Sequence, residues 1–421
     1  MNTPVPTYDE RMFPLMQELL SVTAEIPRIT SGLHVDAEQR QLFMDNELEN
    51  PILEYDQKRL EVVVPQATID TLQKEVDSSE THAVVAELYN KKMHHRSMRV
   101  QLLKAAALHD DTAFLEASTE LYGVPQKKHY SYVVKRVLQQ CDSCEKSHSG
   151  QVRRLRRVLS KSTGDCPFDP DVLPDPVPGK PLTSLAEVQT IFKETLDRLD
   201  LKGWTLEQRT DDRSNFAVCP YSHKVEIPKE EKLLTRRGLS DINMRAVAEH
   251  EIGVHALRNI QGSKQPLRLL QVGLHDYLRG EEGVATYVQQ QVEGAKEFYG
   301  FDRYLAACLA VGMDGNPRDF RGVYSLMVDY YSLQYSNPDE SIEEIRNIAW
   351  QITIRLFRGT TGRTPGCIYT KDIVYMEGNI GVWDLLIEQP QVFDALFIGK
   401  FNPLLTHHVT ALQTLGIINE W

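Results

Sequence analysis

One stretch of the sequence, residues 249–258, reads EHEIGVHALR and carries two histidines with a glutamate between them. Zinc accepts imidazole nitrogens and carboxylate oxygens, and a catalytic zinc keeps three protein ligands and one water. His250 and His255 are therefore candidate metal ligands. Glu251, directly beside the first histidine, is the candidate general base that takes a proton from an attacking water.

The interval between the two histidines is one residue longer than in the common H-E-x-x-H pattern. Five steps along an α-helix overshoot a full turn by about 140°, so both rings could not easily reach one ion. A π-bulge, whose hydrogen bonds run from i to i+5, would return His250 and His255 to one face. Gly253 lies between them, and a glycine lets the backbone adopt such a distorted conformation more easily. The pattern therefore requires a distorted helix at this point.

A third ligand has to come from another element. Glu281 and Glu282 lie at the start of a helical stretch, in the sequence RGEEGVATY at residues 279–287. A carboxylate about 25 to 30 residues downstream resembles the glutamate-type zinc peptidases, and two histidines with one glutamate form a catalytic ligand set. Spacing alone does not choose between the two glutamates. The histidine string alone also fits polar residues on a helix surface, and the downstream acids favour the metal.

The composition is that of an ordinary globular protein. The chain has 421 residues, 41% hydrophobic and 25% charged, and no apolar run approaches the ~20 residues of a membrane-spanning helix. Its first residues lead into Asp9 and Glu10 and show no secretory signal. The six cysteines are scattered, which favours a reducing cytoplasm. A net charge of −12 makes a dedicated nucleic-acid binder unlikely.

One segment is locally basic. Between Lys127 and Lys161 there are ten Lys/Arg residues and two acids. Such a segment forms either a surface that attracts an acidic peptide tail or polyanion, or the solvated face of a helix, and we favour the second interpretation.

Periodicity predicts a helical first half of the chain. Between residues 8 and 150, apolar residues recur at helical intervals, for instance in Thr68–Val76 and Ala83–Leu103. Prolines then cluster, so we divide the chain into a helical region 1–165, a linker 166–182 and a second domain 183–421.

The second half is predicted to be α+β. Ser184 is a plausible N-cap of a helix that extends to Leu199. Phe216–Ile227 is rich in Val and aromatic residues and predicts one or two strands. Ser240 or Asp241 then opens the helix of the two histidines, and helices continue to the C-terminus with an irregular interruption at Gly359–Gly366. The fold class is thus α+β and mostly helical, with a short sheet.

These motifs together resemble the microtubule-associated tyrosine carboxypeptidase family and its bacterial relatives, which are labelled by a QEGLA motif. The resemblance rests on the histidine string, on EEGVA at residues 281–285, and on a later block with RLFRGT at 355–360 and CIYTKDIVYMEG at 367–378. In the QEGLA motif the only acid precedes the first glycine, so the resemblance selects Glu282 as the ligand. Glu281 stands where the label has Gln, and Val284 replaces Leu.

The resemblance implies a zinc metallopeptidase that removes a C-terminal aromatic residue, Tyr or Phe, from a peptide or protein. It also implies a zincin-like catalytic domain with a helical N-terminal region packed on it. The expected cofactor is Zn²⁺, and the expected partner is a peptide C-terminus, with an acidic tail as one candidate. The rival hypothesis is a non-catalytic regulatory or binding protein that retains the metal-site fold.

A carboxypeptidase must bind a terminal carboxylate, which a guanidinium does through paired hydrogen bonds. Arg355 and Arg358 are the first candidates, with Arg363 and Lys371 behind them. Tyr375 or Tyr369 could donate a hydrogen bond to the developing oxyanion. The predicted strand region 217–227 could lie beside the metal helix and pair with an extended peptide.

Two further groups of histidine or cysteine residues could take part in a metal site. His275 and Asp276 could orient a metal ligand, although a simple turn is the better interpretation. Cys141 and Cys144, with His148 nearby, form a lone C-x-x-C that could hold a structural zinc. Because no second pair follows, free thiols are the better interpretation.

Overall fold

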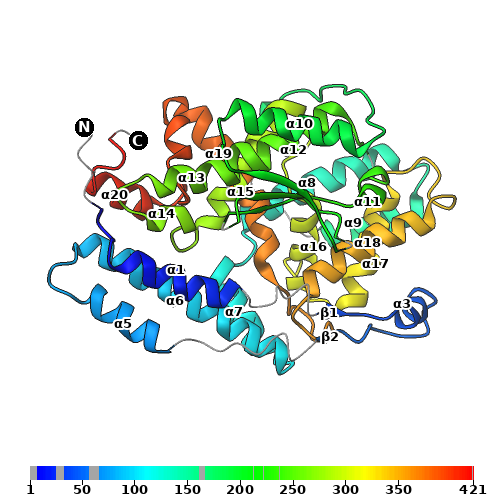
Figure 1. Ribbon diagram of the computed structural model, residues 1–421. Coiled ribbons are helices and arrows are strands. Elements are labelled where there is room, and N and C mark those ends of the chain that lie inside the picture. Colours follow the sequence, from blue (N-terminus) through cyan, green and yellow to red (C-terminus); the bar gives the residue numbers. More distant parts are fainter. Residues whose placement is uncertain are drawn as a thin grey trace.

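The computed structural model describes residues 7–24, 33–55, 66–160, 166–211, 213–220, 222–236, 238–419 and 421. Most of these residues lie in helices, and the strands form one two-stranded and one three-stranded sheet (Figure 1). The predicted α+β, mostly helical class is therefore confirmed. Within this described part, no helix is both long and apolar enough to cross a membrane.

The first half of the chain is helical, as its periodicity predicts. Its α6 is the longest helix, and Asp110 caps the next one by accepting a hydrogen bond from the backbone of Ala113. A small antiparallel pair of strands, β1 (Leu33–His34) with β2 (Glu54–Tyr55), was not predicted. The helices are α1 (Met12–Ala24), α3 (Ala37–Met44), α5 (Gln66–Val76), α6 (Ala83–Ala107), α7 (Asp111–Tyr122), α8 (Lys127–Cys144) and α9 (Ser149–Leu159).

The larger sheet lies directly before the histidine helix in the sequence. Its strands are β3 (Thr205–Gln208), β4 (Ala217–Cys219) and β5 (Lys224–Ile227), in the order β3-β5-β4. β5 pairs in parallel with β3 and antiparallel with β4, which leaves β4 at an edge. The prediction of one or two strands in residues 216–227 is confirmed, with two present, whereas β3 was missed.

Helix α10 (Leu185–Arg198) begins where the sequence predicted. Ser184 and Glu187 form a capping box, in which each side chain meets the other residue's backbone N–H. The helix packs on the sheet, and the ring of Phe192 stacks on Phe216 at a centroid distance of 5.0 Å. This packing fixes the sheet against the helices that follow it.

The remaining helices form most of the second half of the chain. The interruption predicted at 359–366 separates α18 from α19, and the C-terminal helix α20 lies near α13 and α14 (Figure 1). These helices are α11 (Glu230–Leu234), α12 (Asp241–Ala248), α13 (Leu257–Ser263), α14 (Leu269–Val272), α15 (Tyr277–Glu293), α16 (Phe301–Val311), α17 (Phe320–Ser332), α18 (Ile342–Phe357), α19 (Ile373–Glu388) and α20 (Thr406–Thr414).

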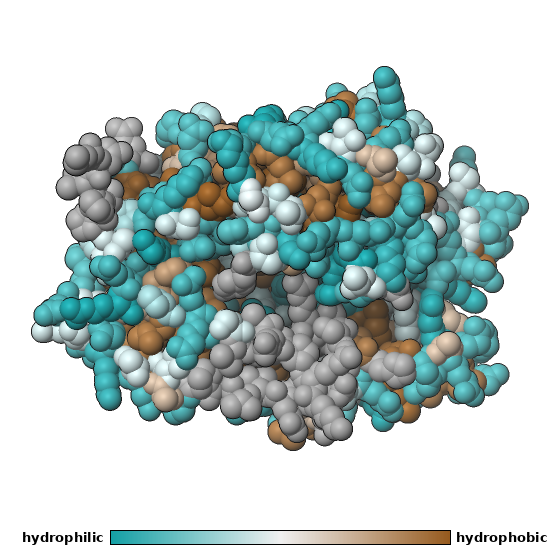
Figure 2. All heavy atoms as spheres, viewed as in Figure 1, coloured by the Kyte–Doolittle hydropathy of each residue, from teal (hydrophilic) through white to brown (hydrophobic). Residues whose placement is uncertain are grey.

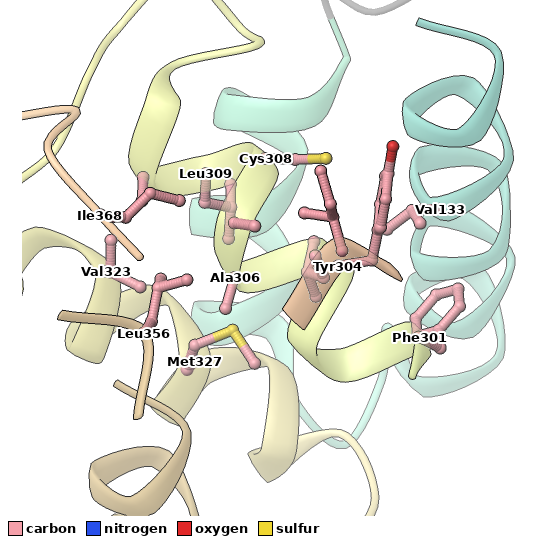
Figure 3. Packing of buried hydrophobic residues seen from close by; sticks show 14 of the residues in the cluster. Val133, Phe301, Tyr304, Ala306, Cys308, Leu309, Val323, Met327, Leu356 and Ile368 are labelled. Atoms are coloured by element: carbon pink, nitrogen blue, oxygen red, sulfur yellow. The ribbon is translucent and has the colours of Figure 1, made fainter. Parts of the chain in front are cut away.

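The largest apolar core contains residues from both sides of the proline-rich segment. Figure 3 shows Tyr304 and Leu309 of α16 at its centre, with Val133 of α8 on one side and Met327 and Leu356 on the other. The division into 1–165, 166–182 and 183–421 stays a prediction, and residues 161–165 lie outside the described part. What the structure adds is that the two halves share this core.

Candidate metal centre

The helix that carries the two histidines is distorted where the sequence requires it. Between α12 and α13, residues Glu249–Ala256 form a π-helix, η2, within one continuous helical segment. The widened turn brings the rings of His250 and His255 to a centroid distance of 4.9 Å. The predicted π-bulge is confirmed. At Gly253 a side chain would meet Glu249, because a Cβ there would lie 2.7 Å from Glu249 Oε2.

Glu282 faces these histidines because helix α15 packs closely on both η2 and α19. Two glycines allow the approach of α15 and α19. A Cβ on Gly283 would lie 2.4 Å from the carbonyl oxygen of Gly378, and a Cβ on Gly378 would lie 2.1 Å from that of Arg279. The glycine that follows Glu282 is therefore required by helix packing, and this packing holds the carboxylate over η2.

The three predicted ligands converge. Glu282 Oε2 lies 3.8 Å from His250 Nε2 and 3.9 Å from His255 Nε2. One ligand atom from each side chain can be chosen so that all three lie within 4.8 Å of one another. Ligand atoms bonded tetrahedrally to zinc at about 2.05 Å are about 3.4 Å apart. The donor set and its spacing therefore fit a zinc ion after small side-chain shifts.

The orientation of His250 is set by a chain of polar side chains. Gln289 donates from Nε2 to Glu293 over 2.7 Å, which turns its Oε1 toward His250 Nδ1 at 3.0 Å. Asn243 donates to the other oxygen of Glu293. His250 Nδ1 must therefore carry the proton, and Nε2 presents its lone pair to Glu282. Burial, with His255 close by, lowers the pKa of His250 to about 4, so the ring is neutral near pH 7.

The orientation of His255 is set by a carboxylate. Its Nδ1 lies 2.9 Å from Glu281 Oε1, which also accepts from Lys400 Nζ at 2.8 Å. The other oxygen of Glu281 accepts from Arg258 at 2.5 Å. Burial alone would raise the pKa of Glu281, but Lys400 and Arg258 hold it well below its usual range. The ambiguity between the two acids is thus resolved geometrically, with Glu282 between the histidines and Glu281 behind His255.

Glu281 also changes the pKa of His255. Burial alone would lower its pKa, but the hydrogen bond to Glu281 and the charge of that carboxylate raise it above its ordinary value. A carboxylate behind a ligating histidine fixes its tautomer and makes it a stronger ligand.

Glu251 lies beside the three ligands and lines the same cavity. Its carboxylate accepts no hydrogen bond from any described residue, so it is free to accept one from a water. This is the arrangement that a general base needs.

The cavity is a groove of 1690 Å³, and Figure 2 shows this face hollowed across its middle. Among the predicted site residues, it is lined by His250, Glu251, His255, Glu282, Arg355, Arg358, Tyr369, Lys371 and Tyr375, but not by Arg363. Its wall also contains basic residues from distant segments that sequence reasoning missed, because no local pattern joins them. The lining Lys and Arg residues are Arg99, Arg213, Lys232, Arg236, Arg279, Arg303, Arg355, Arg358 and Lys371, and the lining acids are Glu120, Glu251, Asp276 and Glu282.

The three predicted carboxylate anchors that line the groove differ in their partners. Arg355 makes a paired contact with Asp372, at 2.5 and 3.0 Å, so its charge is already balanced. Arg358 reaches the same carboxylate at 3.4 Å. Lys371 has no ion pair with any described carboxylate. Burial, with Arg358 nearby, lowers the pKa of Lys371 to about 7. An incoming carboxylate would favour its charged form.

The two predicted tyrosines also differ. Tyr375 lines the groove with its ring 4.8 Å from the Arg303 guanidinium, and burial raises its pKa, so the phenol keeps its proton. Tyr369 is hydrogen-bonded to Tyr122 over 3.2 Å. Tyr375 is therefore the freer donor.

The edge strand β4 packs against η2, and Ala217 and Val218 line the groove. The prediction that this strand region lies beside the metal helix is confirmed. Among the described residues, β4 pairs with β5 alone.

The two remaining candidate groups lie elsewhere. His275 contacts His407 and His408 instead of a proposed ligand. Cys144 Sγ lies 3.4 Å from the carbonyl oxygen of Leu333 and His148 contacts that of Tyr335, so neither faces a shared ion. All six cysteines are free thiols.

The basic segment is partly neutralised by its neighbours. Arg154 pairs with Asp329, and Arg156 pairs with Asp142 and Glu145. These pairs agree with the interpretation as an ordinary helix surface.

The half of the chain that carries this centre is similar in sequence to known proteins. Residues 227–420 match the family model described as microtubule-associated tyrosine carboxypeptidase. Microtubule-associated tyrosine carboxypeptidase 1 of Rattus norvegicus is 23% identical over 248 residues, which are 58% of this chain and 47% of that protein. The mouse and human proteins of the same name are 22% identical over the same length. The chain spans about half the length of the curated relatives it matches. The resemblance inferred from the motifs is confirmed: residues 227–420 are similar to the microtubule-associated tyrosine carboxypeptidases.

Proposed function

We propose that this chain is a zinc-dependent carboxypeptidase with a zincin-like catalytic domain. The observation that carries the proposal is the convergence of His250, His255 and Glu282 beside the carboxylate of Glu251, which no described residue engages in a hydrogen bond. A structural metal site has no need of a free glutamate at that position. The six free thiols support a reducing compartment, and we place the activity in the cytoplasm.

His250, His255 and Glu282 would hold the ion. When bound there, zinc supplies Lewis-acid chemistry, which polarises the scissile carbonyl and makes water more acidic. Glu251 takes the proton of the attacking water and delivers it to the leaving amine. Tyr375 donates a hydrogen bond to the oxygen on which negative charge develops.

The groove would bind the substrate as an extended C-terminus along the edge of β4. Lys371, aided by Arg358, would hold the terminal carboxylate, because among the predicted anchors on the groove wall it is the one with no ion pair to a described carboxylate. The excess of basic residues on the wall favours a peptide with acidic residues before its end. The similarity to tyrosine carboxypeptidases supports a preference for a terminal Tyr or Phe.

The test is the substitution Glu251→Gln, assayed on peptides that end in Tyr, Phe, Leu or an amide. We expect the unmodified protein to release Tyr and Phe and to spare the amide. The variant should keep one zinc per chain and lose about 10²–10⁴-fold in rate. Zinc content by mass spectrometry and released amino acid by chromatography measure both. Equal activity in the variant would overturn the mechanism, and no activity in either protein would favour the regulatory hypothesis.

A further inference from the structure

The loop before α20 reaches the candidate metal centre through a single buried carboxylate. Lys400 Nζ and His255 Nδ1 both contact Glu281 Oε1, at 2.8 and 2.9 Å. We propose that Lys400 is a positioning residue: it holds Glu281 so that His255 keeps Nε2 toward Glu282. The inference rests on the proposed function only in that it takes these residues to bind a metal.

Lys400 is itself held firmly. Its backbone N–H donates to the carbonyl of Leu270 over 2.7 Å, and its own carbonyl accepts from Leu274 over 2.9 Å. Gly399 permits this contact, since a Cβ there would lie 2.7 Å from Leu270 Cβ. The lysine side chain is only 10% exposed. A fixed backbone and a buried side chain allow Lys400 to position the carboxylate.

The second buried cation cannot replace it. Arg258 contacts the opposite oxygen of Glu281, at 2.5 Å, and also donates to the carbonyl of Phe401 over 2.9 Å. Without Lys400, the Lys or Arg side chain that remains on Glu281 among the described residues is Arg258, which contacts the oxygen that faces away from His255. Lys400 therefore fixes the one oxygen that the imidazole uses.

The two histidines thus depend on different kinds of support. His250 is oriented by Gln289, a neutral amide, whereas His255 is oriented by a carboxylate that two cations surround. Groups behind a ligating histidine contribute about 10–100-fold to metal affinity. A residue on the C-terminal loop would therefore set part of the zinc affinity without touching the ion.

The experiment compares Lys400→Met with Lys92→Met. Both lysines are buried near the same ring, with Nζ 6.0 Å and 5.2 Å from the centroid of Tyr277, but only Lys400 contacts Glu281. Zinc affinity is measured on the full chain by competition with a chelator, with circular dichroism to check folding. We expect the zinc Kd to rise about 10–100-fold in Lys400→Met and to stay within about twofold in Lys92→Met.

Two further variants keep the test decisive if Lys400→Met does not fold. Lys400→Arg keeps the charge and should recover most of the affinity. Glu281→Gln should raise the zinc Kd in the same way, and adding Lys400→Met to it should have little further effect, because the two residues act as one unit. An unchanged Kd in Glu281→Gln, or an equal rise in Lys92→Met, would overturn the proposal.

Its failure is distinguishable from a failure of the proposed function. Zinc binding that depends on Lys400, without any release of amino acids from peptides, would support the positioning role and reject the peptidase. Peptide cleavage together with a zinc Kd that does not change when Lys400 is substituted would support the peptidase and reject the positioning role. A full-length chain that binds no zinc would overturn both.

Discussion

The molecule holds two clusters of histidines that look alike by distance and differ in construction. In the candidate metal centre and in the group His275, His407 and His408, potential ligand atoms lie within 4.8 Å of one another. At the metal centre, Nε2 of His250 and Nε2 of His255 both face one carboxylate, and each Nδ1 is engaged behind. Whether a cluster can bind a metal ion thus depends more on the direction of each lone pair than on the distances between the ligand atoms.

The second cluster is connected as a chain. His408 Nδ1 accepts from the backbone of Asn402 over 3.0 Å, so its proton must be on Nε2, which lies 3.4 Å from His275 Nδ1. The other nitrogen of His275 faces His407 Nε2 at 2.8 Å. Because His275 turns a different nitrogen to each neighbour, the three rings do not present lone pairs to one point. This arrangement suits hydrogen bonding and not a single ion.

The largest expected effect separates the two clusters by metal content. His255→Ala should reduce bound zinc from one per chain to nearly none, because it removes one of three ligands. His407→Ala should leave the zinc content unchanged. Elemental analysis after dialysis checks both, and loss of zinc in His407→Ala would show that the second cluster also binds metal.

A smaller effect probes the support of His250. Gln289→Leu removes the acceptor behind Nδ1 while keeping a similar volume. The zinc Kd should rise about tenfold, at the lower end of the range for such groups. Chelator competition measures it, with Gln291→Leu, two residues further along α15, as the control. Equal affinities in the two variants would mean that packing alone orients the ring.

The smallest effect concerns acid and the second cluster. Burial, with His407 close by, lowers the pKa of His275 to about 4, against an ordinary value near 6.5. Since the folded pKa is depressed, its contribution to stability is complete above pH 6.5 and is lost as the pH falls toward 4. Between pH 7 and pH 5, the free energy of unfolding of His275→Gln should therefore fall by about 2 kcal/mol less than that of the unmodified chain.

Urea denaturation of the metal-free protein at both pH values measures this difference. His94→Gln, at an exposed position of α6, is the control. If both variants lose stability with acid as the unmodified protein does, the cluster of His275, His407 and His408 makes no pH-dependent contribution to stability.

What the sequence could predict was local. The five-residue interval between His250 and His255 required a π-turn, Ser184 marked a helix start, and the stretch 216–227, rich in Val and aromatic residues, predicted one or two strands. Each follows from neighbours within a few positions along the chain, where backbone geometry alone limits what is possible.

What remained hidden depends on distant segments. Lys400 lies 119 residues from Glu281, and Arg303 meets Tyr375 only because α16 and α19 pack together. The choice between Glu281 and Glu282 required the resemblance to a family, because adjacent helical residues differ in direction and not in spacing. A strand as short and exposed as β3 leaves too weak a pattern to detect.

The widened turn of η2 has a consequence for how such centres are found. A π-turn absorbs one additional residue locally, so the helices on either side of it keep their direction and their contacts. The interval between His250 and His255 is then set within η2 alone, and the helices on either side of η2 need not change with it. A motif search that demands an interval of four would pass over this chain, whereas one that lets a helix gain a residue between its histidines would retrieve it.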